Sequence, residues 1–182
     1  MPELALHILD LVQNSVSAGA TRVVVTIAWD TSADTLLISI EDDGKGMPPE
    51  LLARVASPFT TTRTTRKVGL GIPMFKANAE LTGGSVDIES EVGVGTRMTA
   101  NFVLSSIDRP PLGDMPSTMV SLVVANPEFH FHLEYAVDKE AFVFDTEEIR
   151  QVLGGVPLDT PEVLSWIEGY IQEGMESLHG GA

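Results

Sequence analysis

The apolar positions near the N-terminus recur at helical spacing, and those that follow have the composition of strands. Between residues 3 and 18 an apolar side chain returns every three or four positions and Gly19 follows, which predicts an amphipathic helix that stops there. The β-branched stretches 21–29 and 35–40 predict two strands joined by a polar turn. The rest of this half is expected to contain a short helix at 49–55, a flexible loop at 56–68, a helix at 70–81, and strands at 85–90 and 96–104.

A break in composition divides the chain. Residues 106–117 hold three prolines, a glycine and two aspartates, which is typical of a linker. Beyond it the pattern predicts strands at 119–125, 129–137 and 141–144, and helices at 146–153 and 161–178. The expected fold is therefore an α/β two-layer sandwich of a mixed sheet with helices on one face, followed by a small α+β part. The domains would be 1–105, the linker 106–117, and 118–182.

The two halves of the chain also differ in net charge. The chain has a formal net charge of −15, and residues 106–182 hold 14 acidic and three basic side chains. Such a surface repels nucleic-acid phosphates and anionic lipid, so neither a nucleic acid nor a membrane is an expected partner. An acidic face that only aids solubility is the alternative. No cysteine is present, no apolar stretch is long enough to span a bilayer, and the N-terminus lacks the features of a signal peptide, which favours a cytoplasmic protein.

The first candidate motif lies on the N-terminal helix. Asp10 and Asn14 are four residues apart and so share one helix face. An asparagine oxygen can bind Mg²⁺, a cation that prefers oxygen ligands, and a carboxylate one turn earlier can orient a water or take its proton. A polar stripe on a surface helix would look the same.

The second motif, Asp42-Asp43-Gly44-Lys45-Gly46-Met47, directly follows a strand. A carboxylate at a strand end can accept a hydrogen bond from an exocyclic amine such as that of adenine. The two glycines let the backbone pass close to a flat ring. A simple Asp-Gly turn is the alternative.

Two more glycine-rich segments complete the set. At Lys67-Val68-Gly69-Leu70-Gly71 a loop leads into a helix, whose first amides and dipole favour an anion, and Arg63, Arg66 and Lys67 can reach phosphate oxygens. Gly93-Val94-Gly95-Thr96 forms a turn before a strand, and Thr96 could hydrogen-bond the Asp42 carboxylate or a water beside the base. A hairpin turn without a functional role is the alternative.

Each motif alone is weak, but their order resembles the GHKL superfamily of ATP-binding domains (gyrase, heat-shock chaperone, histidine kinase and MutL) over residues 3–104. Pro58-Phe59-Thr60-Thr61 is similar to the phenylalanine-containing segment in the ATP lid of histidine kinases. The run 13–21 resembles the corresponding helix of MutL proteins.

The resemblance implies ATP and Mg²⁺ as ligands and gives each matching residue a role. Asn14 would bind Mg²⁺, Asp42 would read the adenine amine, and Thr96 would lie behind the base. Asp10 occupies the position of a catalytic glutamate, and the shorter side chain leaves hydrolysis open. The other expected nucleotide-binding residues are Gly44, Gly46, Met47, Phe59, Arg66, Lys67, Gly69, Leu70 and Gly71.

The expected function is that of a regulatory protein kinase acting on a separate partner. The alternatives are an ATP-sensing module and a slow ATPase whose lid state controls partner binding. Residues 106–182 carry no motif that resembles a particular family, and a partner-binding or homodimerising role is the hypothesis for residues 118–182. Two of their side chains, His130 and His132, share one strand face. A metal site is possible there, but a pair of histidines exposed to solvent is the preferred interpretation.

Overall fold

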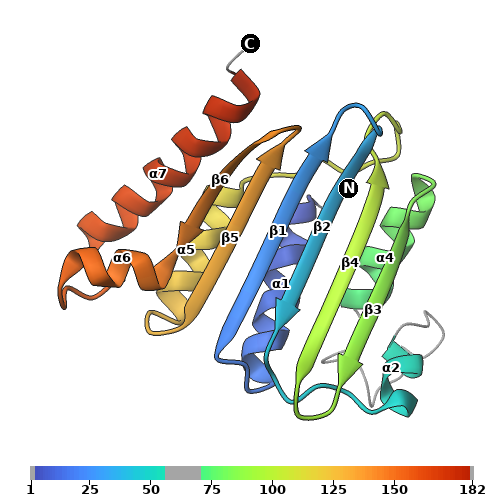
Figure 1. Ribbon diagram of the computed structural model, residues 1–182, viewed down its shortest axis with the longest axis horizontal. Helices are drawn as coiled ribbons and strands as arrows, with labels where there is room; N and C mark the ends of the chain where they lie inside the picture. Colours follow the sequence, from blue (N-terminus) through green and yellow to red (C-terminus); the bar gives the residue numbers. More distant parts are fainter. Residues whose placement is uncertain (1–2, 56–70, 181–182) are drawn as a thin grey trace.

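The computed structural model describes residues 3–55 and 71–180, which form a mixed six-stranded sheet with helices packed on one face (Figure 1). This arrangement confirms the α/β two-layer class expected from the sequence. The elements in chain order are α1 (Leu4–Ser17), β1 (Arg22–Asp30), β2 (Thr35–Asp42), α2 (Pro49–Val55), α4 (Gly71–Leu81), β3 (Ser85–Glu91), β4 (Gly95–Val103), α5 (Met115–Ala125), β5 (His130–Val137), β6 (Glu140–Asp145), α6 (Thr146–Leu153) and α7 (Pro161–Gly180).

The strands lie in the order β3-β4-β2-β1-β5-β6. β1 pairs with β5 in parallel, and every other neighbouring pair is antiparallel. The register places Val23 of β1 opposite Asp42 of β2 on one side and Phe131 of β5 on the other. The loop that carries the second motif therefore leaves the middle of the sheet.

One face of the sheet supplies the core. Val25, Ile38 and Leu133 lie on adjacent strands and are almost completely buried beneath the helices, because successive side chains of a strand point to opposite faces. α1, α4 and α5 lie on this face (Figure 1). α1 contributes Leu4 and Ile8, both fully buried, as its helical spacing predicts.

One predicted element is wrong. Residues 119–125 form part of helix α5 instead of a strand. The run Met119–Ala125 is continuously apolar, and a short apolar run does not distinguish a buried helix from a buried strand. The start of the helix is marked by Asp114, whose side chain accepts a hydrogen bond from the amide of Ser117, and by Pro116 in the first turn. The helix thus begins inside the stretch expected to be a linker.

The sheet and its core continue across residues 106–117. β5 extends the sheet at β1, and Met119 and Leu122 of α5 are fully buried in the same hydrophobic cluster as Ile8. The carbonyls of Pro111 and Leu112 accept hydrogen bonds from the first two amides of α1, at 2.9 and 2.7 Å. Independent folding of residues 1–105 and 118–182 stays a prediction, and these contacts favour a shared core.

None of the helices within residues 3–55 and 71–180 has the length and apolar character needed to cross a bilayer.

Candidate functional site

A cavity of about 160 Å³ lies between α1, the middle strands and the loop after β2. Its walls are mostly apolar, and among the described residues that line it Asp42 is the one acid. Five of the predicted ligand-binding residues line it, from three separate segments of the sequence. The lining residues are Leu11, Asn14, Ser15, Ala18, Ile40, Asp42, Lys45, Gly46, Met47, Leu51, Ile72, Thr96 and Met98.

A larger hollow of about 830 Å³ lies elsewhere, between the α5–β5 connection and the α6–α7 connection. None of the motif residues within the described part of the chain lines it, and its wall includes Glu128, Arg150 and Asp159. Arg150 is already engaged there, because its guanidinium donates to the carbonyls of Pro127 and Phe129 and pairs with Glu147. We therefore take the smaller cavity as the candidate site.

The Asp42 carboxylate is held in place by three donors. Its Oδ2 accepts from the Ser15 hydroxyl at 2.6 Å, and its Oδ1 accepts from the amides of Gly44 at 2.9 Å and Thr96 at 3.3 Å. A carboxylate offers about four acceptor positions, so one remains for a ligand. Because the donors come from α1, the loop and β4, the orientation of this acceptor is fixed before a ligand arrives.

Thr96 contacts Asp42 in a different way from the one expected. Its backbone amide makes the hydrogen bond, while its hydroxyl pairs with the hydroxyl of Ser90 at 2.7 Å. Ser90 also accepts from the amide of Met47 at 2.8 Å and so ties the loop to β3. The side chain of Thr96 thus supports the wall of the cavity through Ser90.

The two residues of the first motif occupy different positions. Asn14 is half-buried and lines the cavity. Asp10, one turn earlier, is exposed and is not among the lining residues. Its Oδ2 lies near the start of α4, 3.7 Å from the position that a Cβ on Gly71 would take. The predicted catalytic role of Asp10 stays a prediction.

The two glycines of the second motif play different structural roles. Gly44 is buried and donates its amide to Asp42. Gly46 has a φ of +72°, and a Cβ there would lie 2.0 Å from the carbonyl oxygen of Glu91, so no other residue fits without displacing the neighbouring hairpin. Lys45 also lines the cavity and was not among the residues expected to do so.

Asp43 anchors the loop from outside the cavity. Its carboxylate accepts hydrogen bonds from the amides of Thr21 and Arg22, at 2.7 and 3.0 Å, and from the Thr21 hydroxyl. Burial alone would raise the pKa of Asp43, but these hydrogen bonds outweigh it and hold the pKa below its ordinary value. The adjacent aspartates thus have separate tasks: Asp43 fixes the loop and Asp42 faces the cavity.

The residues expected on the phosphate side fall largely outside the described ranges. These are Phe59, Arg66, Lys67, Gly69 and Leu70. Gly71 is described: it is buried at the first position of α4, where an added Cβ would lie 3.2 Å from the side chain of Leu11. Close packing of α4 on α1 is therefore the structural reason for a glycine at this position.

Besides Lys45, sequence reasoning missed two polar residues of the site, Ser15 and Ser90. Ser15 was within reach, because it is adjacent to Asn14 in a helix and is a small polar residue on a side that the helix buries. Ser90 gave no comparable signal, since its role depends on the pairing of β3 with β4. Its partners Met47 and Thr96 come from two separate segments.

Comparison with known proteins places the motifs in a family. The family model described as "Histidine kinase-, DNA gyrase B-, and HSP90-like ATPase" matches residues 2–106. Sporulation kinase C of Bacillus subtilis (strain 168) is 34% identical over 88 residues, which are 48% of this chain and 20% of that protein. Sensor protein kinase FleS of Pseudomonas aeruginosa is 37% identical over 105 residues, 58% of this chain and 25% of that protein.

The similarity thus spans a quarter or less of the length of these two relatives. Among solved structures, the N-terminal domain of a DNA repair protein is similar with a TM-score of 0.53 and 13% identity, covering 79% of this chain and 52% of that one. A likeness at this identity supports the fold and carries no statement about activity.

Proposed function

The chain belongs to the family of histidine kinase-, DNA gyrase B- and HSP90-like ATPases, and from this premise we propose that it binds Mg-ATP in the cavity between α1 and the sheet. The observation that supports this most directly is the Asp42 carboxylate, held by three donors in the wall of a mostly apolar cavity. Apolar walls suit the faces of a purine ring, and the remaining acceptor position suits its exocyclic amine.

The metal would be held by a residue of α1. We assign it to Asn14, whose amide oxygen is the type of ligand that Mg²⁺ accepts alongside phosphate oxygens and water. The described residues fit such a site in one respect: Asn14 is half-buried and lines the cavity. Bound Mg²⁺ would neutralise phosphate charge there, and the role of the chain is to position the triphosphate.

We further propose that the bound ATP serves phosphoryl transfer to a separate protein partner. The support is the similarity to two proteins named as kinases, over the nucleotide-binding part alone. Hydrolysis by Asp10 has less support, because its carboxylate is exposed and lies outside the cavity wall. An ATP sensor without chemistry is the third alternative.

Base selectivity tests the site itself. Asp42 should accept from the adenine amine, whereas GTP places a carbonyl oxygen there, which a carboxylate repels. We expect ATP to bind at least tenfold more tightly than GTP by isothermal titration calorimetry. Asp42→Asn should weaken ATP binding by about 1–3 kcal/mol, or roughly fivefold to 150-fold, because a charged hydrogen bond is lost in a partly buried position.

The matched control is Asp87→Asn, which removes the same charge from an exposed position on β3 that does not line the cavity. This variant should discriminate ATP from GTP as the parent does. Equal affinities of the parent chain for ATP and GTP would show that Asp42 does not read the base.

The fate of the γ-phosphate distinguishes the three functions. With γ-labelled ATP and an extract of the source cell, label on a protein indicates a kinase, free labelled phosphate a hydrolase, and intact ATP a sensor. The Asp42→Asn variant should lose whichever signal the parent gives.

A further inference from the structure

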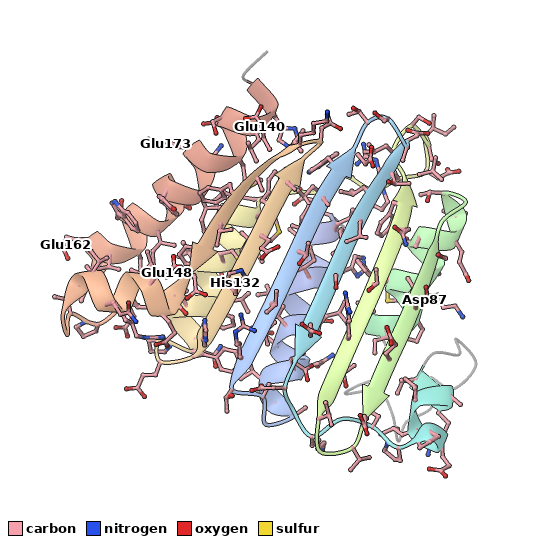
Figure 2. All side chains as sticks on the ribbon, in the orientation of Figure 1. Asp87, His132, Glu140, Glu148, Glu162 and Glu173 are labelled. Atoms are coloured by element: carbon pink, nitrogen blue, oxygen red, sulfur yellow. The ribbon has the colours of Figure 1, made fainter. Side chains whose placement is uncertain are left out.

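The outer face of α7 carries two exposed aromatic side chains between two carboxylates. Glu162, Trp166, Tyr170 and Glu173 are spaced by four, four and three residues and so lie along one side of the helix; we call them the α7 stripe. Figure 2 shows Glu162 and Glu173 pointing from α7 away from the sheet. The opposite side of the helix buries Ile167 and Ile171 completely. The core therefore leaves the two glutamates and most of Trp166 exposed.

The aromatic pair is ordered in advance. The rings of Trp166 and Tyr170 are stacked, with centroids 4.9 Å apart and an angle of 14° between their planes. Tyr170 is fixed from below, because its hydroxyl donates to the carbonyl of Val143 on β6 at 3.2 Å and its ring lies 5.0 Å from that of Phe142. Trp166 nevertheless stays 51% exposed. A rigid, exposed tryptophan is the kind of residue that dominates binding at interfaces.

The charge around the stripe selects the partner. Within α7 there are four glutamates and no lysine or arginine, and residues 106–182 hold 14 acidic and three basic side chains. A lysine or arginine over the face of a tryptophan gains a cation–π interaction, which the flanking carboxylates reinforce. A second copy of this chain is disfavoured, because two stripes facing each other would bring like charges together.

From these observations we propose that the α7 stripe docks a basic segment of a partner protein, with arginine or lysine side chains over Trp166 and Tyr170 and further basic groups on Glu162 and Glu173. The inference rests on the proposed function in one respect: the proposed function assumes a protein partner, and the inference gives the surface that binds this partner and the chemistry of the partner's side chains. α7 lies beside β6, at the end of the sheet opposite β3, α4 and the nucleotide site (Figure 1). A partner held here would leave the cavity open.

The test uses the full chain and a short synthetic peptide of alternating arginine and serine. We expect calorimetry to show saturable binding that weakens as salt is added. Trp166→Ala should lower the affinity several-fold to about tenfold, in keeping with the loss of a cation–π contact, and Trp166→Phe should restore part of it. Because Trp166 is half exposed and alanine favours helices, the variants should unfold at nearly the parent temperature, which circular dichroism checks.

Charge is tested by a matched pair of double variants. Glu162→Gln with Glu173→Gln should weaken peptide binding and reduce its salt dependence. Asp87→Asn with Glu89→Gln removes the same charge from exposed positions on β3, at the far edge of the sheet, and should leave the affinity unchanged.

Three results would overturn the proposal. They are unchanged peptide affinity in Trp166→Ala, equal weakening in both double variants, and a dimer in sedimentation that Trp166→Ala dissociates while the peptide does not bind. The outcome is independent of the nucleotide site, since Trp166→Ala should bind ATP as the parent does. Loss of ATP binding in the parent would refute the proposed function and leave the peptide result standing.

Discussion

The turn between β3 and β4 offers a direct test of how the fold supports the site. Gly93 and Gly95 both have positive φ, +82° and +144°. They differ in their surroundings: a Cβ on Gly93 would meet nothing within 4 Å, whereas a Cβ on Gly95 would lie 2.0 Å from the carbonyl oxygen of Asp42. Substituting each by alanine therefore separates backbone strain from a clash with the residue that faces the cavity.

The expected magnitudes follow from this difference. Gly93→Ala adds only the conformational penalty of positive φ, about 1–2 kcal/mol. Gly95→Ala adds to it the overlap with Asp42, and forcing an extra group into a packed site costs about 1–3 kcal/mol more, so the total is about 2–5 kcal/mol. For a chain of this size about 1 kcal/mol corresponds to about 2–4 °C in Tm, which gives about 2–8 °C for Gly93→Ala and about 4–20 °C for Gly95→Ala.

The clash also has a consequence for binding. An ordinary contact between carbon and oxygen is about 3.3 Å or longer, so β4 must move by more than about 1 Å from the end of β2 to accept the methyl group. That movement would stretch the hydrogen bond from the Thr96 amide to Asp42, already 3.3 Å long, and turn the carboxylate. We expect Gly95→Ala to weaken ATP binding about tenfold, and Gly93→Ala to bind as the parent does.

Thermal unfolding followed by circular dichroism, with ATP titration of each variant at a temperature where it is folded, measures both effects. Equal losses of Tm in the two variants, or a normal ATP affinity in a destabilised Gly95→Ala, would refute the link between this turn and Asp42.

Three further predictions concern the metal, acid stability and the two parts of the chain. Asn14→Ala should abolish the Mg²⁺ dependence of ATP affinity in calorimetry; a variant with the parent's dependence would rule out Asn14 as the ligand. Asp145→Asn should lower the free energy of unfolding by about 1–3 kcal/mol at neutral pH. Burial alone would raise the pKa of Asp145, but hydrogen bonds from His130, His132 and two backbone amides of α6 outweigh it and hold the pKa below its value in the unfolded chain. The stability that the Asp145 carboxylate contributes is therefore present above about pH 4 and is lost as the pH falls through the folded pKa. Denaturant melts between pH 7 and pH 3 should therefore show parent and variant converging, and a constant gap would contradict the assignment. A chain that ends at Ser105 should aggregate or lose cooperative unfolding, because it uncovers β1 and part of α1, whereas a soluble fragment that binds ATP would establish residues 1–105 as a domain.

Periodicity was sufficient wherever an element has one buried face. The stripe of α1 and the alternation in β5, where Phe131 and Leu133 are buried and His132 is not, could be predicted from single stretches of sequence. Periodicity did not predict α5 as a helix, because α5 packs against both α1 and α7 and is apolar on most sides. The competing signals of Asp114 and Pro116 were local and pointed to a helix, but the expected linker obscured them.

The site shows the same division between local and distant information. Asp42, Gly46 and Asn14 could be proposed from short motifs, since their chemistry depends on spacing within one element. The hydrogen bonds that fix Asp42 come from α1 and β4, and no spacing rule links those segments. The contacts of Asp145 also join separate segments of the chain. Its Oδ2 lies 2.9 Å from Nε2 of His130 and 2.7 Å from Nδ1 of His132, so the histidines are paired with a carboxylate instead of lying free in solvent.

The order of the strands also reconciles the charge of the chain with an anionic ligand. ATP carries several negative charges, and a net charge of −15 would oppose its approach if the carboxylates surrounded the cavity. The sheet instead places β5 and β6, with α6 and α7 beside them, on the side of β1 away from β2 and β4. From β2 to β6 there are three strand spacings, or about 14 Å, and α7 lies beyond. That separation exceeds the Debye length of about 8 Å at physiological ionic strength, so the acidic C-terminal part repels the nucleotide only weakly. The negative charge of the C-terminal part can still attract a basic partner at the α7 stripe. The parallel pairing of β5 with β1 would thus have a functional consequence, because one sheet would hold two sites that prefer ligands of opposite charge.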